Sequence, residues 1–236
     1  MTGKIVILTG AGISAESGLG TFRDEDGLWT QYDLSEVATP KGFARNPSMV
    51  QAFYNARRAN CLAAAPNAAH YALARLQRDY AGDVIIVTQN VDDLHERGGA
   101  MGVIHMHGQL TVALCAACRA RWPAPPEMHV TDPCPTCDAT ATRPDVVWFG
   151  ETPYHMDEIT THLASCTLFA AIGTSAEVYP AAGFVELAAD ARAHTVELNL
   201  EPSSQVSFFA ETRPGPATQT VPVWVDDILS RKPPRL

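Results

Sequence analysis

The chain has 236 residues, of which 46% are hydrophobic, and a formal net charge of −9. This length fits one large domain, or one domain with an inserted module, and the acidic charge argues against a nucleic-acid partner. The longest apolar runs are too short to span a membrane, and the first one leads directly into a glycine loop. We therefore expect a cytoplasmic protein with no targeting segment and no membrane partner.

Short runs rich in valine and isoleucine alternate with helical patterns along the chain. The predicted strands are 5–9, 84–88, 103–106, 146–149, 168–172 and 195–198. The predicted helices are 47–63, 67–80 with Asn67 as its cap, a short helix from about 92, 181–190 and 223–230. Buried strands that alternate with helices are typical of a parallel sheet covered on both faces. Between residues 112 and 144 the periodicity is lost, which predicts a small inserted module.

A glycine motif follows the first predicted strand. Residues 10–15 read GAGISA, with Gly10, Ala11 and Gly12 at its start. Glycines let the backbone approach a pyrophosphate, and the helix that follows offers free N–H groups. An ordinary dinucleotide fold has an acidic residue about 20 positions later, at the end of a second strand. Here residues 20–33 read as a loop. The glycine motif therefore favours a nucleotide site, while the missing strand and acidic residue argue against a simple dehydrogenase.

The predicted helix 47–63 contains the stretch QAFYNARR, in which Tyr54 and Arg57 stand three residues apart. On a helix these two side chains lie on the same face. A guanidinium and a phenol together suit a carboxylate, because the guanidinium bonds both oxygens and the phenol adds one donor. An ordinary amphipathic helix with a solvated arginine is the alternative, and this stretch alone leaves it open. Arg58 is expected to face elsewhere on the helix.

Polar residues follow several of the predicted strands. They are Gln89, Asn90 and Asp92 after the second strand, His105 and His107 around the third, and the loops GTSAEVYP at 173–180 and NLEPS at 199–203. Because ligands bind at the carboxyl ends of parallel strands, we expect these residues to gather at one edge of the sheet. Asp92 also suits a helix cap, and the pattern does not decide which histidine belongs to the site.

Four of the six cysteines form two pairs, Cys115-x-x-Cys118 and Cys134-x-x-Cys137, with fifteen residues between the pairs. This spacing predicts one tetrahedral zinc ion. Four thiolates fill the coordination sphere, so the ion is expected to be structural. The charges within the module balance, which gives no support to a nucleic-acid-binding zinc ribbon.

In this order the motifs resemble the sirtuin family of NAD-dependent protein-lysine deacylases. The matching elements are GAGIS with SG-x-x-TFR, TQNVDDLH, HG after a strand, the two cysteine pairs, VWFGE, GTS and NLEPS. The resemblance implies an α/β fold, with one catalytic domain over 1–236 and a Rossmann-like parallel sheet that binds NAD. It also implies a small domain made of a four-cysteine zinc module at 112–144 and a helical module at 34–76 that contains the acyl pocket.

The resemblance also implies a role for each matching residue. The NAD-binding residues are Gly10, Ala11, Gly12, Phe22, Arg23, Gln89, Asn90, Asp92, Gly173, Thr174, Ser175, Asn199, Glu201 and Ala217. The substrate backbone is expected to run between two segments as an added strand. The substrate residues of these segments are Val147, Trp148, Phe149 and Gly150, with Glu177, Val178 and Tyr179. The family places its catalytic histidine directly before a glycine, which selects His107. Leu19-Gly20-Thr21 departs from the usual Ile-Pro, which affects the expected stiffness of the loop.

The implied reaction transfers an acyl group from lysine to NAD. The acyl oxygen attacks the anomeric carbon of the ribose, nicotinamide leaves and an alkylimidate forms. His107, as general base, takes a ribose hydroxyl proton so that the 2′-oxygen attacks the imidate. Water then releases free lysine and 2′-O-acyl-ADP-ribose. Sirtuins that prefer negatively charged acyl groups carry a Tyr-x-x-Arg pair, which Tyr54 and Arg57 resemble. We therefore expect a monomer, with NAD and one zinc ion, that removes succinyl, malonyl and also acetyl groups from protein lysines.

Four alternatives remain at this point. A plain deacetylase or a mono-ADP-ribosyltransferase would use the same scaffold, and product analysis separates them. A zinc-stabilised interaction module that senses NAD would bind NAD without turnover, and replacement of His107 would decide. A dehydrogenase is the weakest alternative, because the acidic residue expected early in the chain is missing.

Overall fold

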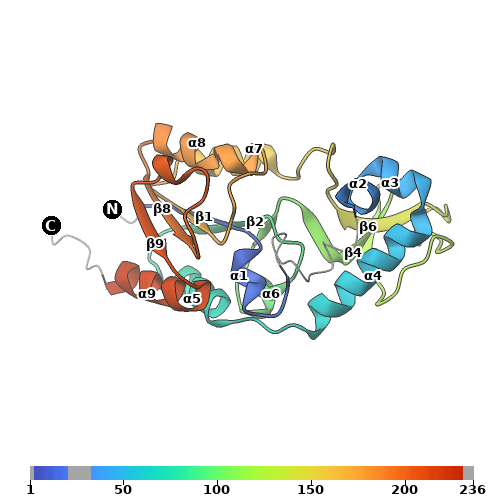
Figure 1. Cartoon of the computed structure of the whole chain (residues 1–236), viewed down its shortest axis with the longest axis horizontal. Coiled ribbons are helices and arrows are strands. Elements are labelled where there is room, and N and C mark those ends of the chain that lie inside the picture. Colours follow the sequence, from blue (N-terminus) through green and yellow to red (C-terminus); the bar gives the residue numbers. More distant parts are fainter. Residues whose placement is uncertain (1–2, 21–32, 231–236) are drawn as a thin grey trace.

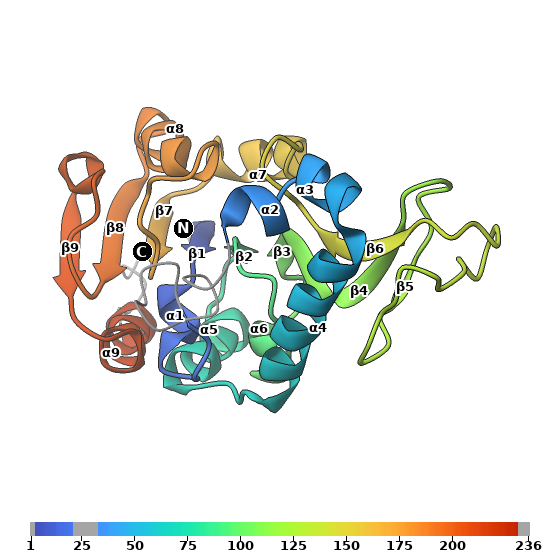
Figure 2. The same ribbon diagram turned by 45° about the vertical axis from the view of Figure 1, so that its right-hand side comes forward.

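The computed structural model describes residues 3–20 and 33–230. Its centre is a parallel sheet of six strands in the order β3-β2-β1-β7-β8-β9 (Figure 2). The strands are β1 (Ile5–Thr9), β2 (Val84–Thr88), β3 (Ile104–His105), β7 (Leu168–Ile172), β8 (His194–Asn199) and β9 (Glu211–Pro214). Because the strand order reverses at β1, the carboxyl ends of β1 and β7 flank the crevice where such sheets bind ligands.

Helices cover both faces of this sheet (Figure 1). On one face lie α1 (Gly12–Ala15), α5 (Ala68–Asp79), α6 (Leu94–Arg97) and α9 (Ala217–Ser230), and on the other lie α7 (Met156–Leu163) and α8 (Phe184–Asp190). In β1, Ile5 and Ile7 enter one core while Val6 and Leu8 enter the other, as the period of a strand requires. The predicted parallel sheet with helices on both faces is confirmed.

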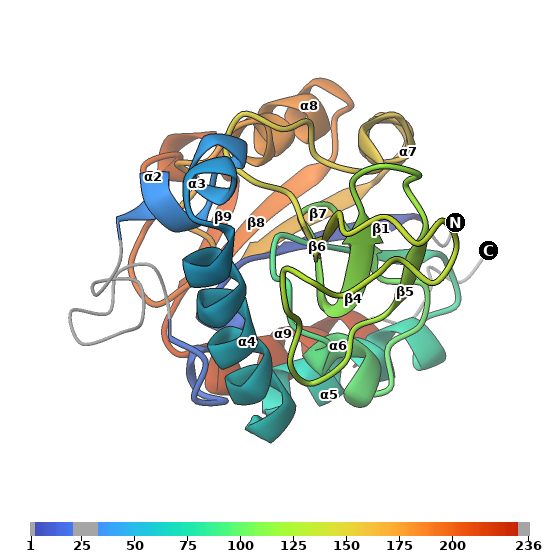
Figure 3. The same cartoon turned by 90° about the vertical axis from the view of Figure 1, so that its right-hand side faces the viewer.

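A second, smaller unit projects from the sheet (Figure 3). Strand β4 (Gly108–Cys115) lies between β5 (Arg121–Pro123) and β6 (Thr142–Val146), and pairs antiparallel with both. Helices α2 (Leu34–Val37), α3 (Pro40–Arg45) and α4 (Pro47–Ala63) pack against it around a third core. Helix α5 packs instead on the large sheet beside α9. The predicted helical range 34–76 therefore spans two packing units.

The strongest sequence patterns match the structure residue for residue. Strands β1, β2 and β7 and helix α4 have the predicted bounds. The side chain of Asn67 accepts a hydrogen bond from Ala69 N–H, and His70 Nδ1 accepts one from Asn67 N–H, so α5 begins with a capping box.

Two predicted elements differ most from the structure in their bounds. The strand predicted at 146–149 ends at Val146, because Val147 N–H bonds to His107 O and Phe149 N–H bonds to Ala38 O, outside the β4–β6 ladder. Helix α9 begins at Ala217 instead of 223, although Pro222 lies inside it. Its first turn is held from outside, because the Glu16 carboxylate accepts hydrogen bonds from both the N–H and the hydroxyl of Thr218.

Within residues 3–20 and 33–230, none of the helices combines the length and the apolar character that crossing a membrane requires.

Candidate active site

Two glycine loops meet at the carboxyl ends of β1 and β7. Gly10 N–H donates to Ile172 O at 3.0 Å, and Gly12 N–H donates to Gly173 O at 2.8 Å. Gly173 has φ +61, and a Cβ there would lie 2.4 Å from Ile13 N. Only glycine allows this approach, which leaves a bare backbone surface at the switch point of the sheet. The predicted pyrophosphate loop and the 173–175 loop are therefore adjacent.

A buried polar network supports the first loop. The Asn90 amide donates to Gly10 O at 3.1 Å and to Ser14 Oγ at 3.2 Å, and the Ser14 hydroxyl donates to Asp92 Oδ2 at 3.1 Å. The other Asp92 oxygen accepts Leu94 N–H at 3.1 Å, so Asp92 also serves the start of α6. Burial raises the pKa of the Asp92 carboxyl. Asn90 and Asp92 thus lie together, as predicted, and the serine between them belongs to the same network.

The remaining predicted NAD residues lie along neighbouring strand ends. Gln89 Nε2 donates to Thr174 Oγ1 at 2.9 Å, and Asn199 Nδ2 donates to Thr174 O at 2.8 Å, which joins the ends of β2, β7 and β8. Ser175 is half-buried, Glu201 is exposed, and Ala217 is buried as the first residue of α9. Phe22 and Arg23 lie outside the described residues.

The two histidines near β3 have different surroundings. His105 is buried, and its two ring nitrogens contact Asn90 O at 3.3 Å and Glu96 Oε1 at 2.7 Å. His107 is half-buried, and its Nδ1 lies 3.1 Å from Gln89 O. Since a carbonyl oxygen only accepts, Nδ1 of His107 carries the proton and Nε2 keeps the lone pair. His107 is therefore the histidine equipped to act as a base.

The predicted pocket pair lies on α4. Tyr54 is buried in the core of the small unit, while Arg57 is half-buried. The guanidinium carbon of Arg57 lies 5.8 Å from the ring centres of both Phe53 and Tyr54. Burial lowers the pKa of Arg57, while Tyr54 and Asp92 act to raise it. The guanidinium is therefore partly withdrawn from water and does not lie on an open helix surface.

The predicted peptide-binding segments contain both buried and exposed side chains. Trp148 is buried, and its backbone N–H and C=O are both bonded to Glu151 in a tight turn that contains Gly150. Phe149, Val178 and Tyr179 are exposed by 48%, 39% and 69%, which leaves these large apolar side chains available to a peptide. Val147 is half-buried and Glu177 is exposed.

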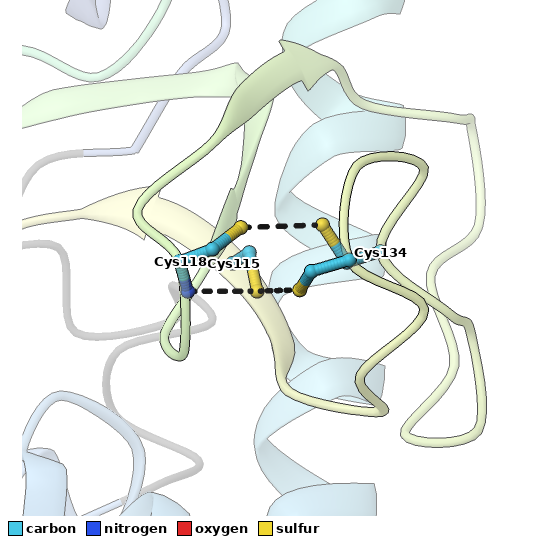
Figure 4. A group of neighbouring side chains, drawn as sticks. Cys115, Cys118 and Cys134 are labelled. Atoms are coloured by element: carbon cyan, nitrogen blue, oxygen red, sulfur yellow. Dashed lines mark hydrogen bonds between the residues drawn. The ribbon is translucent and has the colours of Figure 1, made fainter.

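The four paired cysteines converge between β4 and the loop before β6. Figure 4 shows Cys115, Cys118 and Cys134 of this cluster. The sulfur atoms lie 3.7 Å apart in the pairs Cys115–Cys137 and Cys118–Cys134, and all four lie within 4.8 Å of one another. A tetrahedron with Zn–S bonds of about 2.3 Å has sulfur–sulfur edges of about 3.8 Å. The four residues therefore fit a zinc ion, which would join the two knuckles and leave no open position for chemistry.

Residues 10–180 match the model of the Sir2 family, which is well over half of the chain. The chain belongs to the Sir2 family. The predictions of the sirtuin family and of its α/β fold with a cysteine module are thereby confirmed.

Relatives of this Sir2 protein match along almost their whole length. An NAD-dependent protein deacylase of Caulobacter vibrioides is 55% identical over 232 residues, with 97% of this chain and 98% of the relative covered. The NAD-dependent protein deacylase SIR2rp3 of Trypanosoma brucei brucei is 48% identical over 237 residues, with 98% and 97% covered. The predicted enzyme class, an NAD-dependent protein deacylase, is confirmed.

Solved structures agree with the fold and with the cofactor. A Sir2 homologue in complex with ADP-ribose has a TM-score of 0.89 at 35% identity, covering 95% of this chain and 91% of that one. A Sir2 homologue in complex with NAD has a TM-score of 0.88 at 35% identity, covering 96% and 91%. NAD as co-substrate is the prediction that these neighbours support.

Arg58 of α4 faces β4, and its burial was not expected from the sequence. It is 1% exposed, and its Nε donates to Leu110 O of β4 at 2.7 Å while its NH1 donates to Asn55 Oδ1 at 2.8 Å. It shares the buried face with Gln51 and Tyr54, at positions seven and four residues before it. This helical spacing indicated that Arg58 is buried, but arginine is seldom predicted to lie in a core because it is rarely fully buried.

The environment of His107 predicts the acid limb of the pH profile. Burial lowers the pKa of His107 below 6.5, so the neutral base persists at pH 7 and is lost only as the pH falls through the lowered pKa. We expect kcat/KM to fall as the pH drops through this lowered pKa, with a midpoint below the ordinary histidine value of 6.5. A profile of kcat/KM between about pH 5 and pH 8, with folding monitored by tryptophan fluorescence, measures this limb. A midpoint above 6.5 would contradict the buried base.

The zinc site predicts a large stability effect. We expect one zinc ion per chain, and a fall of roughly 10 °C in Tm when Cys134→Ser removes one ligand, because the metal closes the small unit. Metal analysis and thermal unfolding measure the two quantities. Cys166→Ala, which removes a buried thiol outside the cluster, is the control and should keep its zinc. Full zinc content and an unchanged Tm in Cys134→Ser would show that the cluster holds no structural ion.

Proposed function

We propose that this Sir2 protein removes acyl groups from protein lysines with NAD as co-substrate, and that it prefers acyl groups that end in a carboxylate, such as succinyl and malonyl. The observation that carries the preference is the pair on α4. Arg57 is half-buried, and its guanidinium carbon lies 5.8 Å from the ring centres of both Phe53 and Tyr54. A carboxylate is the group that both side chains bind through donors.

The electrostatics of α4 favour a charged acyl group. A carboxylate that enters beside Arg57 accepts up to two N–H bonds from its guanidinium, and this charge-assisted pairing is strong where water is excluded. An acetyl group ends in a methyl group and carries no charge, so its removal continues without this gain.

His107 and the residues around it account for the shared chemistry. Bound NAD supplies the ribose that accepts the acyl group. The lone pair on His107 Nε2 takes a hydroxyl proton, while Gln89 O fixes the ring through Nδ1. Asn90 and Asp92 hold the glycine loop through Ser14, and thereby fix the position of the ribose end of the site.

The proposed peptide mode uses the exposed side chains of the two predicted peptide-binding segments. Phe149 on one segment, and Val178 and Tyr179 on the other, support a bound backbone that lies between them as an added strand. We also propose that the protein is a cytoplasmic monomer that acts on acylated proteins. Light scattering of the purified protein measures its molar mass and tests the monomer.

Product analysis tests the reaction. The protein is incubated with NAD and a peptide that carries one succinyl-lysine, and all products are followed by mass spectrometry. We expect free lysine, nicotinamide and succinyl-ADP-ribose in equal amounts, and none of them without NAD. A target that gains the mass of ADP-ribose would identify a mono-ADP-ribosyltransferase instead. Binding of NAD with no turnover would favour the sensor module.

A further inference from the structure

The indole of Trp148 is bonded to the phenol of Tyr54. Trp148 Nε1–H donates to Tyr54 Oη at 2.9 Å, and the two side chains are exposed by only 2% and 1%. An indole N–H is a donor and never an acceptor, so at this contact Tyr54 must accept. The direction of this hydrogen bond is therefore fixed by chemistry.

The fixed bond determines where the Tyr54 proton can go. A phenol has one O–H donor and two acceptor lone pairs. The indole takes one lone pair, and the guanidinium of Arg57, on the same helix face, has only donors to offer. Neither neighbour can accept the phenolic proton. It is therefore available to an acceptor that enters the pocket.

The position of the Trp148 indole is fixed by contacts with neighbouring side chains. The guanidinium carbon of Arg143 lies 3.4 Å from the centre of the Trp148 ring, and Arg143 binds both Glu151 oxygens at 2.6 and 2.9 Å. The same Glu151 carboxylate accepts the Trp148 backbone N–H at 2.8 Å, and the ring of Phe43 lies 5.1 Å away. A cation over an indole face withdraws electron density from the ring, which strengthens its N–H as a donor.

We infer that Trp148 is a positioning residue for acyl specificity, whose indole N–H fixes the Tyr54 hydroxyl as a donor to the terminal carboxylate of the acyl group. The inference rests on the proposed function of the α4 pair. Trp148 acts through Tyr54 and contacts no reacting atom. A neutral acyl group of the same length gains nothing from this arrangement, because it carries no acceptor at its end.

Trp148→Phe tests the inference, because it keeps an aromatic ring and removes the N–H. The substrates are matched peptides with succinyl-lysine and with butyryl-lysine, which has the same chain length but ends in a methyl group. We expect the ratio of kcat/KM for succinyl over butyryl to fall about five- to tenfold, mainly through KM for the succinyl peptide. Added to Tyr54→Phe, it should cause no further fall in the ratio, because both changes remove the same oriented donor.

Trp224→Phe, which trims a tryptophan buried in α9, controls for the loss of an indole from a core. It should leave the succinyl-to-butyryl ratio unchanged. The inference is overturned if Trp148→Phe keeps the parental ratio, if both peptides lose activity equally, or if the effects of Trp148→Phe and Tyr54→Phe multiply. If the parent shows no preference for succinyl and Arg57→Met does not alter its ratio, the proposed function fails and the inference fails with it. If the parent prefers succinyl, Arg57→Met abolishes that preference and Trp148→Phe keeps it, the inference about Trp148 is wrong and the proposed function stands.

Discussion

His107→Ala is expected to lower kcat by about 10²–10⁴-fold, the usual contribution of a general base. The reason is geometric, because Gln89 O holds the Nδ1 proton and leaves Nε2 as the only basic nitrogen of this ring. Single-turnover rates with saturating NAD and peptide measure the loss. NAD binding, followed by calorimetry, should change by only a few-fold, since the glycine loops and the Asn90 network are untouched.

His105→Asn is the matched control for this experiment. His105 is bonded at both ring nitrogens, so its replacement should lower stability and keep most of the turnover. If instead His105→Asn abolished turnover and His107→Ala kept it, the assignment of the base would be reversed.

Arg57→Met is expected to lower kcat/KM for a succinyl-lysine peptide by about 10²-fold, because a desolvated charge pair is worth several kcal/mol. Tyr54→Phe should lower it by about tenfold, the value of one hydrogen bond to a charged group. Arg57 should have the larger effect because it carries the charge and is the more exposed of the two. Initial rates with succinyl and acetyl peptides measure both variants.

Activity on the acetyl peptide should stay within a few-fold of the parent in both variants, because the short acyl group ends before the pair. Arg45→Met, which removes an exposed arginine from the neighbouring helix α3, controls for the loss of a positive charge. Equal losses on both peptides would show that Arg57 supports the fold of α4 and does not select the acyl group.

The elements that the sequence predicted best are those whose local pattern agrees with their packing. Strand β1 is buried along its whole length, and its apolar run has no competing interpretation. The cysteine spacing likewise needs only two short turns to bring the four thiols together. Helix α9 and the segment after Val146 were misjudged, because their bounds depend on distant partners. Glu16 holds the first turn of α9, and His107 and Ala38 take the N–H groups after β6.

The sequence predicted that polar residues would gather at one edge of the sheet, because they follow neighbouring strand ends, and the structure brings Gln89, Thr174 and Asn199 together there. What the sequence did not show is how these residues support one another. Ser14 links Asn90 to Asp92, yet a serine after a glycine turn is common. The contact between Trp148 and Tyr54 joins residues far apart in the chain, and neither local periodicity nor spacing encodes it.

The most direct test of the carboxylate preference is the ratio of kcat/KM for succinyl-lysine over butyryl-lysine in the parent protein, with the same peptide sequence and saturating NAD. The two acyl groups have the same length and differ at the end that meets Arg57 and Tyr54. We expect the succinyl peptide to be favoured by at least about tenfold, as one hydrogen-bonded charge pair requires. Equal values, or a preference for butyryl, would contradict a pocket that selects a carboxylate.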